Sequence, residues 1–428
     1  MKLELRATRL ANGLRVATAT MPTLESVALG IWVGAGGRHE RAEQAGISHF
    51  IEHLLFKGTT TRSARAISQA IEGRGGYLNA YTQEESTCYY AHIAAEHTAE
   101  ALDLLTDMFL QPRFAAGDIK KERGVIIEEI EMYRDQPQQH VQEMLNGILW
   151  PNHPLGRSLT GTPETVSTLK RDDFFSYKAT RYAPAVTLVA FAGQVEHEST
   201  VAQVGKILGS WNARRPSTPR PVTVRSPQHA VTVLGKDIEQ AQLALGLRLF
   251  GRHDPRKYAL KLLSTVLGEN MSSRLFQVVR ERHGLAYSIH TSVELFHDTG
   301  MLEISAGVDA EKLPRAVQLI IGELKRLCAQ PIGAAELRRA KDYVIGQLRI
   351  GLEGATHQMT WAADNLLNFD CFIQPDEIIT AIHRISAADI RQLARAVLRA
   401  ERLSLALIAP AAGTAEEKLL RAARCRLA

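Results

Sequence analysis

The chain has 428 residues, of which 45% are hydrophobic and 23% are charged, values typical of a folded globular protein. Two domains of about 200 residues each are expected, because a single core rarely grows beyond about 250–300 residues. The net charge is only +5 and no long run of Lys or Arg occurs, which argues against a nucleic-acid-binding protein.

Residues 1–22 predict a turn and a strand, not a targeting segment. They contain no continuous apolar core and no small-residue cleavage signature, and Asn12 and Gly13 form a typical hairpin turn. No stretch approaches the roughly 20 apolar residues that span a bilayer. The cysteines are widely separated, which favours free thiols in a reducing compartment; they are Cys88, Cys328, Cys371 and Cys425. We therefore expect a cytoplasmic protein with neither a membrane nor a nucleic acid as partner.

The segment GISHFIEHLLFKGTTTRS at residues 46–63 places two histidines and a glutamate on one face of an expected helix. His49, Glu52 and His53 have the spacing i, i+3, i+4, so the two imidazoles can converge on one ion. This is the HxxEH pattern of the inverted zincins, whose glutamate lies between the ligands without coordinating the metal. The alternative is a set of polar residues on an ordinary helix, and the motif alone does not decide between them.

A catalytic zinc ion usually has three protein ligands, so a carboxylate is expected on a second helix. The helical segment at 118–137 contains Glu122, Glu128, Glu129 and Glu131. Glu122 and Glu129 are two turns apart and share a face, whereas Glu128 points about 100° away. In isolation, a solvated acidic helix would be the preferred interpretation of this segment.

Four prolines and four arginines occur in the stretch WNARRPSTPRPVTVRSPQH at 211–229, which predicts a linker between domains at 1–210 and 230–428. The two halves resemble each other at an offset of about 215 residues. For example, ESVALGIWVGAGGRHE at 25–40 corresponds to EQAQLALGLRLFGRHD at 239–254. We therefore expect an internal duplication of a whole α+β domain.

Taken together, several segments resemble the pitrilysin-type metallopeptidases, in particular the mitochondrial-processing-peptidase-like branch. They are GISHFIEHLLFKGT, GGYLNAYTQEEST, KERGVIIEEI and VRERHGLAYS, which occur in the expected order. The resemblance covers nearly the whole chain. It implies two tandem domains, each a mostly antiparallel sheet with helices packed on one face. It also implies an endopeptidase that hydrolyses peptides or unfolded segments with a zinc-activated water.

By this resemblance, His49, His53 and Glu129 bind one Zn2+ per chain. Glu52 is then the general base that accepts the proton of the attacking water and passes it to the leaving amine. Glu122 is implied to support one of the two histidines, and the sequence leaves open which one.

The resemblance also implies a substrate-binding apparatus. The segment YLNAYT alternates as a strand does, and it would be an edge strand that pairs with an extended substrate, with Asn79 and Ala80 near the scissile bond. Arg280 and Tyr287 would bind the substrate and stabilise the oxyanion, with Arg282 as the alternative arginine. Without the resemblance, Asn79 would be interpreted as a turn residue, Arg280 as a solvated helix residue and Tyr287 as a core tyrosine.

The noncatalytic subunit of the mitochondrial enzyme has a glycine-rich loop, and the corresponding stretch here, LGENMSSRLF at 267–276, is not glycine-rich. We therefore expect a self-sufficient bacterial-type member. Long members of the family contain four such domains, so a two-domain chain is expected to form a homodimer with shared sites. A noncatalytic assembly subunit and a peptidase dedicated to one precursor remain as alternatives.

Overall fold

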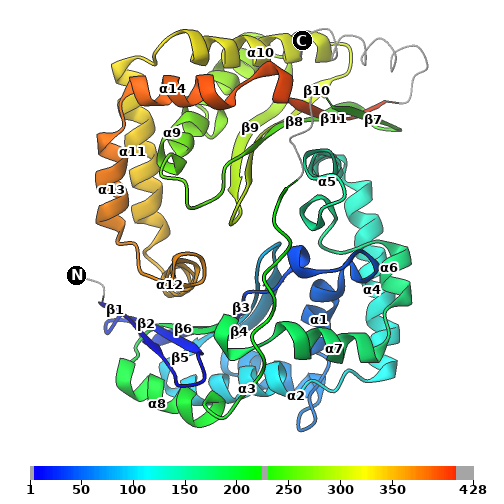
Figure 1. Cartoon of the computed structure of the whole chain (residues 1–428), viewed down its shortest axis with the longest axis vertical. Coiled ribbons are helices and arrows are strands. Elements are labelled where there is room, and N and C mark those ends of the chain that lie inside the picture. The colour runs from blue at the N-terminus through cyan, green and yellow to red at the C-terminus, as the bar shows by residue number, and fades with distance from the viewer. Residues whose placement is uncertain (1–3, 224–229, 411–428) are drawn as a thin grey trace. The chain divides into compact units, whose positions relative to one another are not determined.

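Each half of the chain contains a mixed β-sheet (Figure 1). The computed structural model describes residues 4–223 and 230–410. In spatial order, the strands of the first sheet are β1 (Glu4–Arg9), β2 (Arg15–Thr20), β6 (Thr187–Gly193), β3 (Ser26–Val33), β5 (Thr87–Ala94) and β4 (Tyr77–Thr82). Only β2 and β6 pair in parallel; the other neighbours are antiparallel.

The second sheet repeats this arrangement without a counterpart of β1. Its strands, in spatial order, are β7 (Val231–Lys236), β11 (Ser404–Pro410), β8 (Gln240–Leu249), β10 (Gly300–Asp309) and β9 (Ala286–Leu295). Strands β7 and β11 pair in parallel and correspond in position to β2 and β6 of the first sheet, whereas the other neighbours are antiparallel. The shared topology confirms the predicted tandem α+β domains with mostly antiparallel sheets.

Helices from the first half cover one face of the first sheet and enclose a large apolar core. They are α1 (Ile47–Leu55), α2 (Ala64–Ile71), α3 (Thr98–Leu110), α4 (Ala116–Asp135), α6 (Pro163–Thr168), α7 (Arg171–Arg181) and α8 (His197–Leu208). The opposite face is lined by small side chains such as Ala17, Ala28 and Ala190, and α12 (Ala355–Phe369) packs against them (Figure 1).

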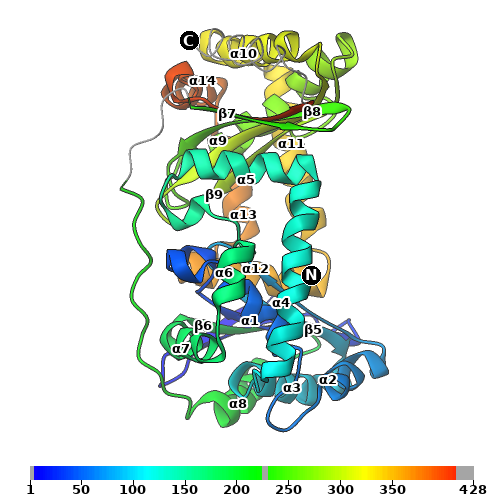
Figure 2. The same ribbon diagram turned by 90° about the vertical axis from the view of Figure 1, so that its right-hand side faces the viewer.

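The second sheet is covered in the same way. One face packs against α9 (Lys257–Gly268), α10 (Leu313–Ala329), α11 (Ala334–Gly351), α13 (Pro375–Arg384) and α14 (Ala387–Val397). The other face packs against α5 (Pro137–Leu149), which runs along the strands in Figure 2. Gly246 of β8 permits this approach, because a Cβ there would lie 2.7 Å from the side chain of Leu145.

Each compact unit therefore includes one helix from the other half of the sequence. The first unit comprises residues 4–131, 157–220 and 349–373, and the second comprises the remaining described residues. The expectation of helices on one face was incomplete, because the second face of each sheet is also apolar and must be covered. In the predicted linker, residues 211–223 form neither helix nor strand, and 224–229 lie outside the described residues.

Within residues 4–223 and 230–410, no helix has the length and apolar character needed to cross a membrane. The predicted turn after β1 is present, with Gly13 at a φ of 93°. Cys88, Cys328 and Cys371 are free thiols, and Cys425 lies outside the described residues.

Candidate metal centre

Helix α1 places three polar side chains opposite its apolar face. Its buried residues are Ile47, Ser48, Phe50, Ile51, Leu54 and Leu55. His49, Glu52 and His53 lie on the remaining side, and the two imidazole rings are 4.6 Å apart between centroids. The local helical spacing thus brings these side chains together, as predicted.

The start of α1 is held by a buried carboxylate and a glycine. Glu40 accepts hydrogen bonds from the backbone N–H groups of Gly46 and Ser48, both at 2.8 Å, which satisfies two free amides of the first turn. Burial raises the pKa of Glu40 to about 7, although these hydrogen bonds oppose the shift. Gly46 has a φ of 91°, and a Cβ there would overlap the carbonyl oxygen of Thr160. The backbone that carries the histidines is therefore tightly constrained.

Helix α4 supplies the carboxylate that faces both histidines. Glu129 Oε2 lies 3.7 Å from His49 Nε2 and 3.6 Å from His53 Nε2. These distances are too long for hydrogen bonds, but they are near the separation of about 3.3 Å expected between donors around a tetrahedral zinc ion. Within the described part of the chain, this is the only group of three His, Cys, Asp or Glu side chains arranged to hold a metal ion.

The chemistry of these donors fits zinc. Burial, followed by the charge of His53, lowers the pKa of His49 to about 4, so its imidazole is neutral and available as a ligand at neutral pH. Imidazole nitrogens and a carboxylate oxygen are ligands that zinc accepts readily. A zinc ion at this cluster would be held by His49, His53 and Glu129.

Glu122, one of the acidic residues on α4, contacts His53. Its Oε2 atom lies 3.3 Å from His53 Nδ1, and its Oε1 atom lies 2.9 Å from the Lys57 ammonium group. The carboxylate is buried, with 6% of the residue exposed, and a buried charge needs such a partner. The structure thus shows that Glu122 contacts His53 and not His49, and it adds Lys57, which sequence reasoning missed.

We expect Glu122→Gln to weaken zinc binding by about 10–100-fold, because a neutral amide orients the His53 imidazole less strongly than a carboxylate does. Competition with a chromophoric chelator measures the dissociation constant directly. Glu128→Gln, which changes an exposed carboxylate on the same helix, is the matched control. Equal zinc affinities in the two variants would contradict the proposed support of His53.

Glu52 is held by a neighbouring strand. The Thr82 hydroxyl group donates a hydrogen bond to Glu52 Oε2 at 2.6 Å. Burial raises the pKa of Glu52, and the hydrogen bond from Thr82 opposes this shift. Thr82 ends the segment YLNAYT, but nothing in its local sequence pointed to this contact.

The predicted substrate strand is β4, which is one of the two edge strands of the first sheet. Asn79 is exposed on it and Ala80 is half-buried. The Asn79 side-chain oxygen accepts a hydrogen bond from the backbone N–H of Ala80 at 2.8 Å. Among the described strands, β4 pairs only with β5, so the backbone groups on its other side could pair with an extended chain.

Arg280 and Tyr287 come together in the second unit. Arg280 lies on the π-helical turn Phe276–Arg282, and Tyr287 lies near the start of β9. The guanidinium carbon is 5.7 Å from the centre of the Tyr287 ring, in a cation–π arrangement. Tyr287 is 75% exposed, which is unusual for a large aromatic residue. The pair thus offers an exposed phenol beside a cation.

Among the described residues of the second unit, no comparable metal cluster occurs. Helix α9 takes the place of α1 after the corresponding strand, and its sequence, KYALKLLSTVLG, contains no His, Cys, Asp or Glu.

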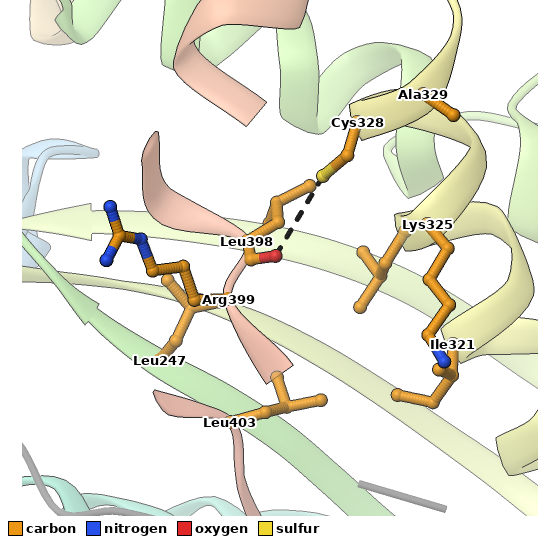
Figure 3. Close-up of a pocket in the computed structure, with 9 residues that line it drawn as sticks. Leu247, Ile321, Lys325, Cys328, Ala329, Leu398, Arg399 and Leu403 are labelled. Carbon is orange, nitrogen blue, oxygen red and sulfur yellow. Dashed lines mark hydrogen bonds between the residues drawn. The ribbon is translucent and has the colours of Figure 1, made fainter. Parts of the chain in front are cut away.

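The second unit contains a pocket of about 270 Å³ between α10, β8 and the segment before β11 (Figure 3). Its walls are mainly leucine and isoleucine side chains, and the Cys328 thiol donates to the carbonyl of Leu398. Burial raises the pKa of the Cys328 thiol, which makes it a weak nucleophile.

Comparison with known proteins gives matches over both halves. Residues 15–163 match the profile of the insulinase family, peptidase family M16, and residues 168–344 match that of the M16 inactive domain. The chain is 38% identical over 410 residues to a Mycobacterium tuberculosis protein named an uncharacterized zinc protease, covering 95% of this chain and 93% of that protein. A Bacillus subtilis protein with the same description is 38% identical over 401 residues, covering 93% of this chain and 97% of that protein.

Solved structures share the fold. The crystal structure of a protease from Helicobacter pylori matches with a TM-score of 0.89 and 20% identity, covering 95% of this chain and 100% of that chain. A Pseudomonas fluorescens structure described as a peptidase M16 inactive domain matches with a TM-score of 0.89 and 17% identity, covering 96% and 99%.

Proposed function

Because the chain belongs to the insulinase family of peptidases, family M16, we propose that it is a zinc-dependent endopeptidase that cleaves peptides or unfolded segments. The observation that carries the proposal is the convergence of His49, His53 and Glu129, with Glu52 on the same helix face. These residue types in this arrangement are those that metal-assisted hydrolysis requires.

When bound, zinc would activate a water molecule and polarise the scissile carbonyl group. Glu52 acts as the general base: it accepts a proton from the attacking water and donates it to the leaving amine. Its burial raises its pKa, which makes the carboxylate a better proton acceptor than an exposed one. Glu122 accepts a hydrogen bond from the Nδ1–H group of His53, which would leave the Nε2 lone pair available to the metal.

Two further elements would bind the substrate. An extended peptide would add to the free edge of β4 by backbone hydrogen bonds, with Asn79 and Ala80 next to the scissile bond. Tyr287 would donate its hydroxyl hydrogen to the developing oxyanion, and Arg280 would hold a substrate carbonyl. The exposure of Tyr287 supports this role, because its hydroxyl group is available to a ligand.

A noncatalytic assembly role is the second candidate function. Such a role places no demand on the metal ligands or the base, yet in this chain His49, His53 and Glu129 converge and Glu52 lies on the same helix face as the two histidines. The presence of the complete set therefore favours catalysis. A peptidase dedicated to one precursor would have the same site and would differ in the range of peptides that it cleaves.

Mass spectrometry of a peptide mixture incubated with the pure protein tests the proposal. We expect new internal cleavages that stop when a chelator removes the metal and return when zinc is added back. Cleavage that is insensitive to the chelator would contradict the metallopeptidase assignment. The absence of cleavage by protein that contains one zinc ion per chain would favour the assembly role.

The resemblance described above further implies a homodimer in which Arg280 and Tyr287 of one copy act with the metal of the other. Mixing Glu52→Gln chains with Arg280→Ala/Tyr287→Phe chains should then restore about one quarter of the native activity, because random pairing leaves one intact site in half of the dimers. Peptidase assays after verified subunit exchange measure this recovery. No recovery would refute shared sites.

A further inference from the structure

The Thr82 hydroxyl group lies 2.6 Å from Glu52 Oε2, and none of the roles described above for catalysis or binding uses this residue. Glu52 is on α1, between the two histidines, whereas Thr82 ends β4. The contact therefore connects the helix of the candidate base with the edge strand of the sheet. Its length is typical of the stronger hydrogen bonds between a hydroxyl group and a carboxylate.

The position of Thr82 is well defined by its surroundings. It pairs with Thr87 of β5 in the strand register. Leu78 and Ala80, which share its side of β4, pack against the apolar core. In addition, a β-branched side chain has few χ1 positions. The hydroxyl group is thus presented to α1 by a strand that is paired on one side and packed against the core.

A glutamate carboxylate without partners rotates broadly about its last torsion angle. When Oε2 is held by Thr82, that rotation is restricted and Oε1 remains available to accept a proton. Orientation matters for catalysis, because a misplacement of about 1 Å can lower a rate by about 10²-fold.

We propose that Thr82 is a positioning residue, whose hydroxyl group holds Glu52 so that its free oxygen faces the attacking water. The inference rests on the proposed peptidase function. It also gives β4 two tasks, because the strand that would pair with the substrate is the one that orients the base.

The test compares Thr82→Val, which has the same shape without the hydroxyl group, with Thr82→Ser, which retains the hydroxyl group. We expect Thr82→Val to lower kcat by about 10–100-fold with little change in KM, and Thr82→Ser to recover most of the loss. Thr106→Val, which removes another buried hydroxyl group from the first unit, should leave kcat unchanged. A kcat of Thr82→Val within twofold of the native value, or no recovery in Thr82→Ser, would overturn the inference.

A second measurement does not depend on peptidase activity. In the metal-free protein, the unfolding midpoints of Thr82→Val, Glu52→Ala and the double variant form a double-mutant cycle. Non-additive shifts are expected, because either single change removes the same hydrogen bond, whereas additive shifts would overturn the contact. Should Thr82→Val not fold, Thr82→Ala replaces it in both experiments. A native protein that cleaves nothing would refute the proposed function, and the cycle would still show whether Thr82 holds Glu52.

Discussion

Glu52→Gln is expected to retain zinc and to lose at least about 10²–10⁴-fold in kcat, the range that general-base catalysis contributes. Glutamine has the shape of glutamate, and its side-chain oxygen can still accept the Thr82 hydrogen bond, so the local structure should persist. Its amide cannot accept the proton of the attacking water at neutral pH. The change therefore removes the chemistry and leaves the metal ligands in place.

Steady-state kinetics on protein of measured zinc content tests this expectation. Glu128 is an exposed carboxylate on α4. The Glu128→Gln variant is the control for a general effect of charge and should have native activity. A loss of less than fivefold in Glu52→Gln would show that the base lies elsewhere in the molecule.

His53→Ala is expected to weaken zinc binding by more than about 100-fold, beyond the range of the change at Glu122, and to abolish chelator-sensitive hydrolysis. The substitution removes one of three ligands and also leaves the buried Glu122 without the imidazole that it contacts. Zinc does not bind tightly to two remaining protein ligands, because the usual site has three or four.

Elemental analysis after dialysis against a weak chelator measures the retained zinc. His97 lies outside the metal cluster and pairs with Arg74 and Glu100. The His97→Ala variant is therefore the control, and it should retain about one zinc ion per chain. Full zinc retention with normal activity in His53→Ala would overturn the assignment of the ligands.

The duplicated fold could be predicted because its signal is local and repeated. Apolar strands at 26–33 and 240–249 recur with the same neighbours along the chain, and the two sheets have the same strand order apart from β1. The sequence pattern did not predict that α5, from the first half, packs against the second sheet and that α12, from the second half, packs against the first. A helical pattern shows which face is apolar, but it does not show which sheet that face will cover.

The same distinction holds for the candidate site: contacts within one helix could be predicted from the sequence, whereas contacts between distant segments could not. His49 and His53 are about one helical turn apart, so the sequence was sufficient to predict that their side chains lie on the same helix face. The choice of Glu129 among the acidic residues of α4 depended on the resemblance to a known family. The contacts of Glu122 with His53 and of Thr82 with Glu52 join residues 69 and 30 positions apart, and only the folded chain shows them.

Anomalous scattering from a crystal of the zinc-loaded protein, measured on both sides of the zinc absorption edge, tests the central claim most directly. A single peak is expected in each chain, at about 2.0–2.2 Å from a nitrogen of His49, a nitrogen of His53 and an oxygen of Glu129. A peak at other side chains, or no peak at these three in protein shown to contain zinc, would contradict the account.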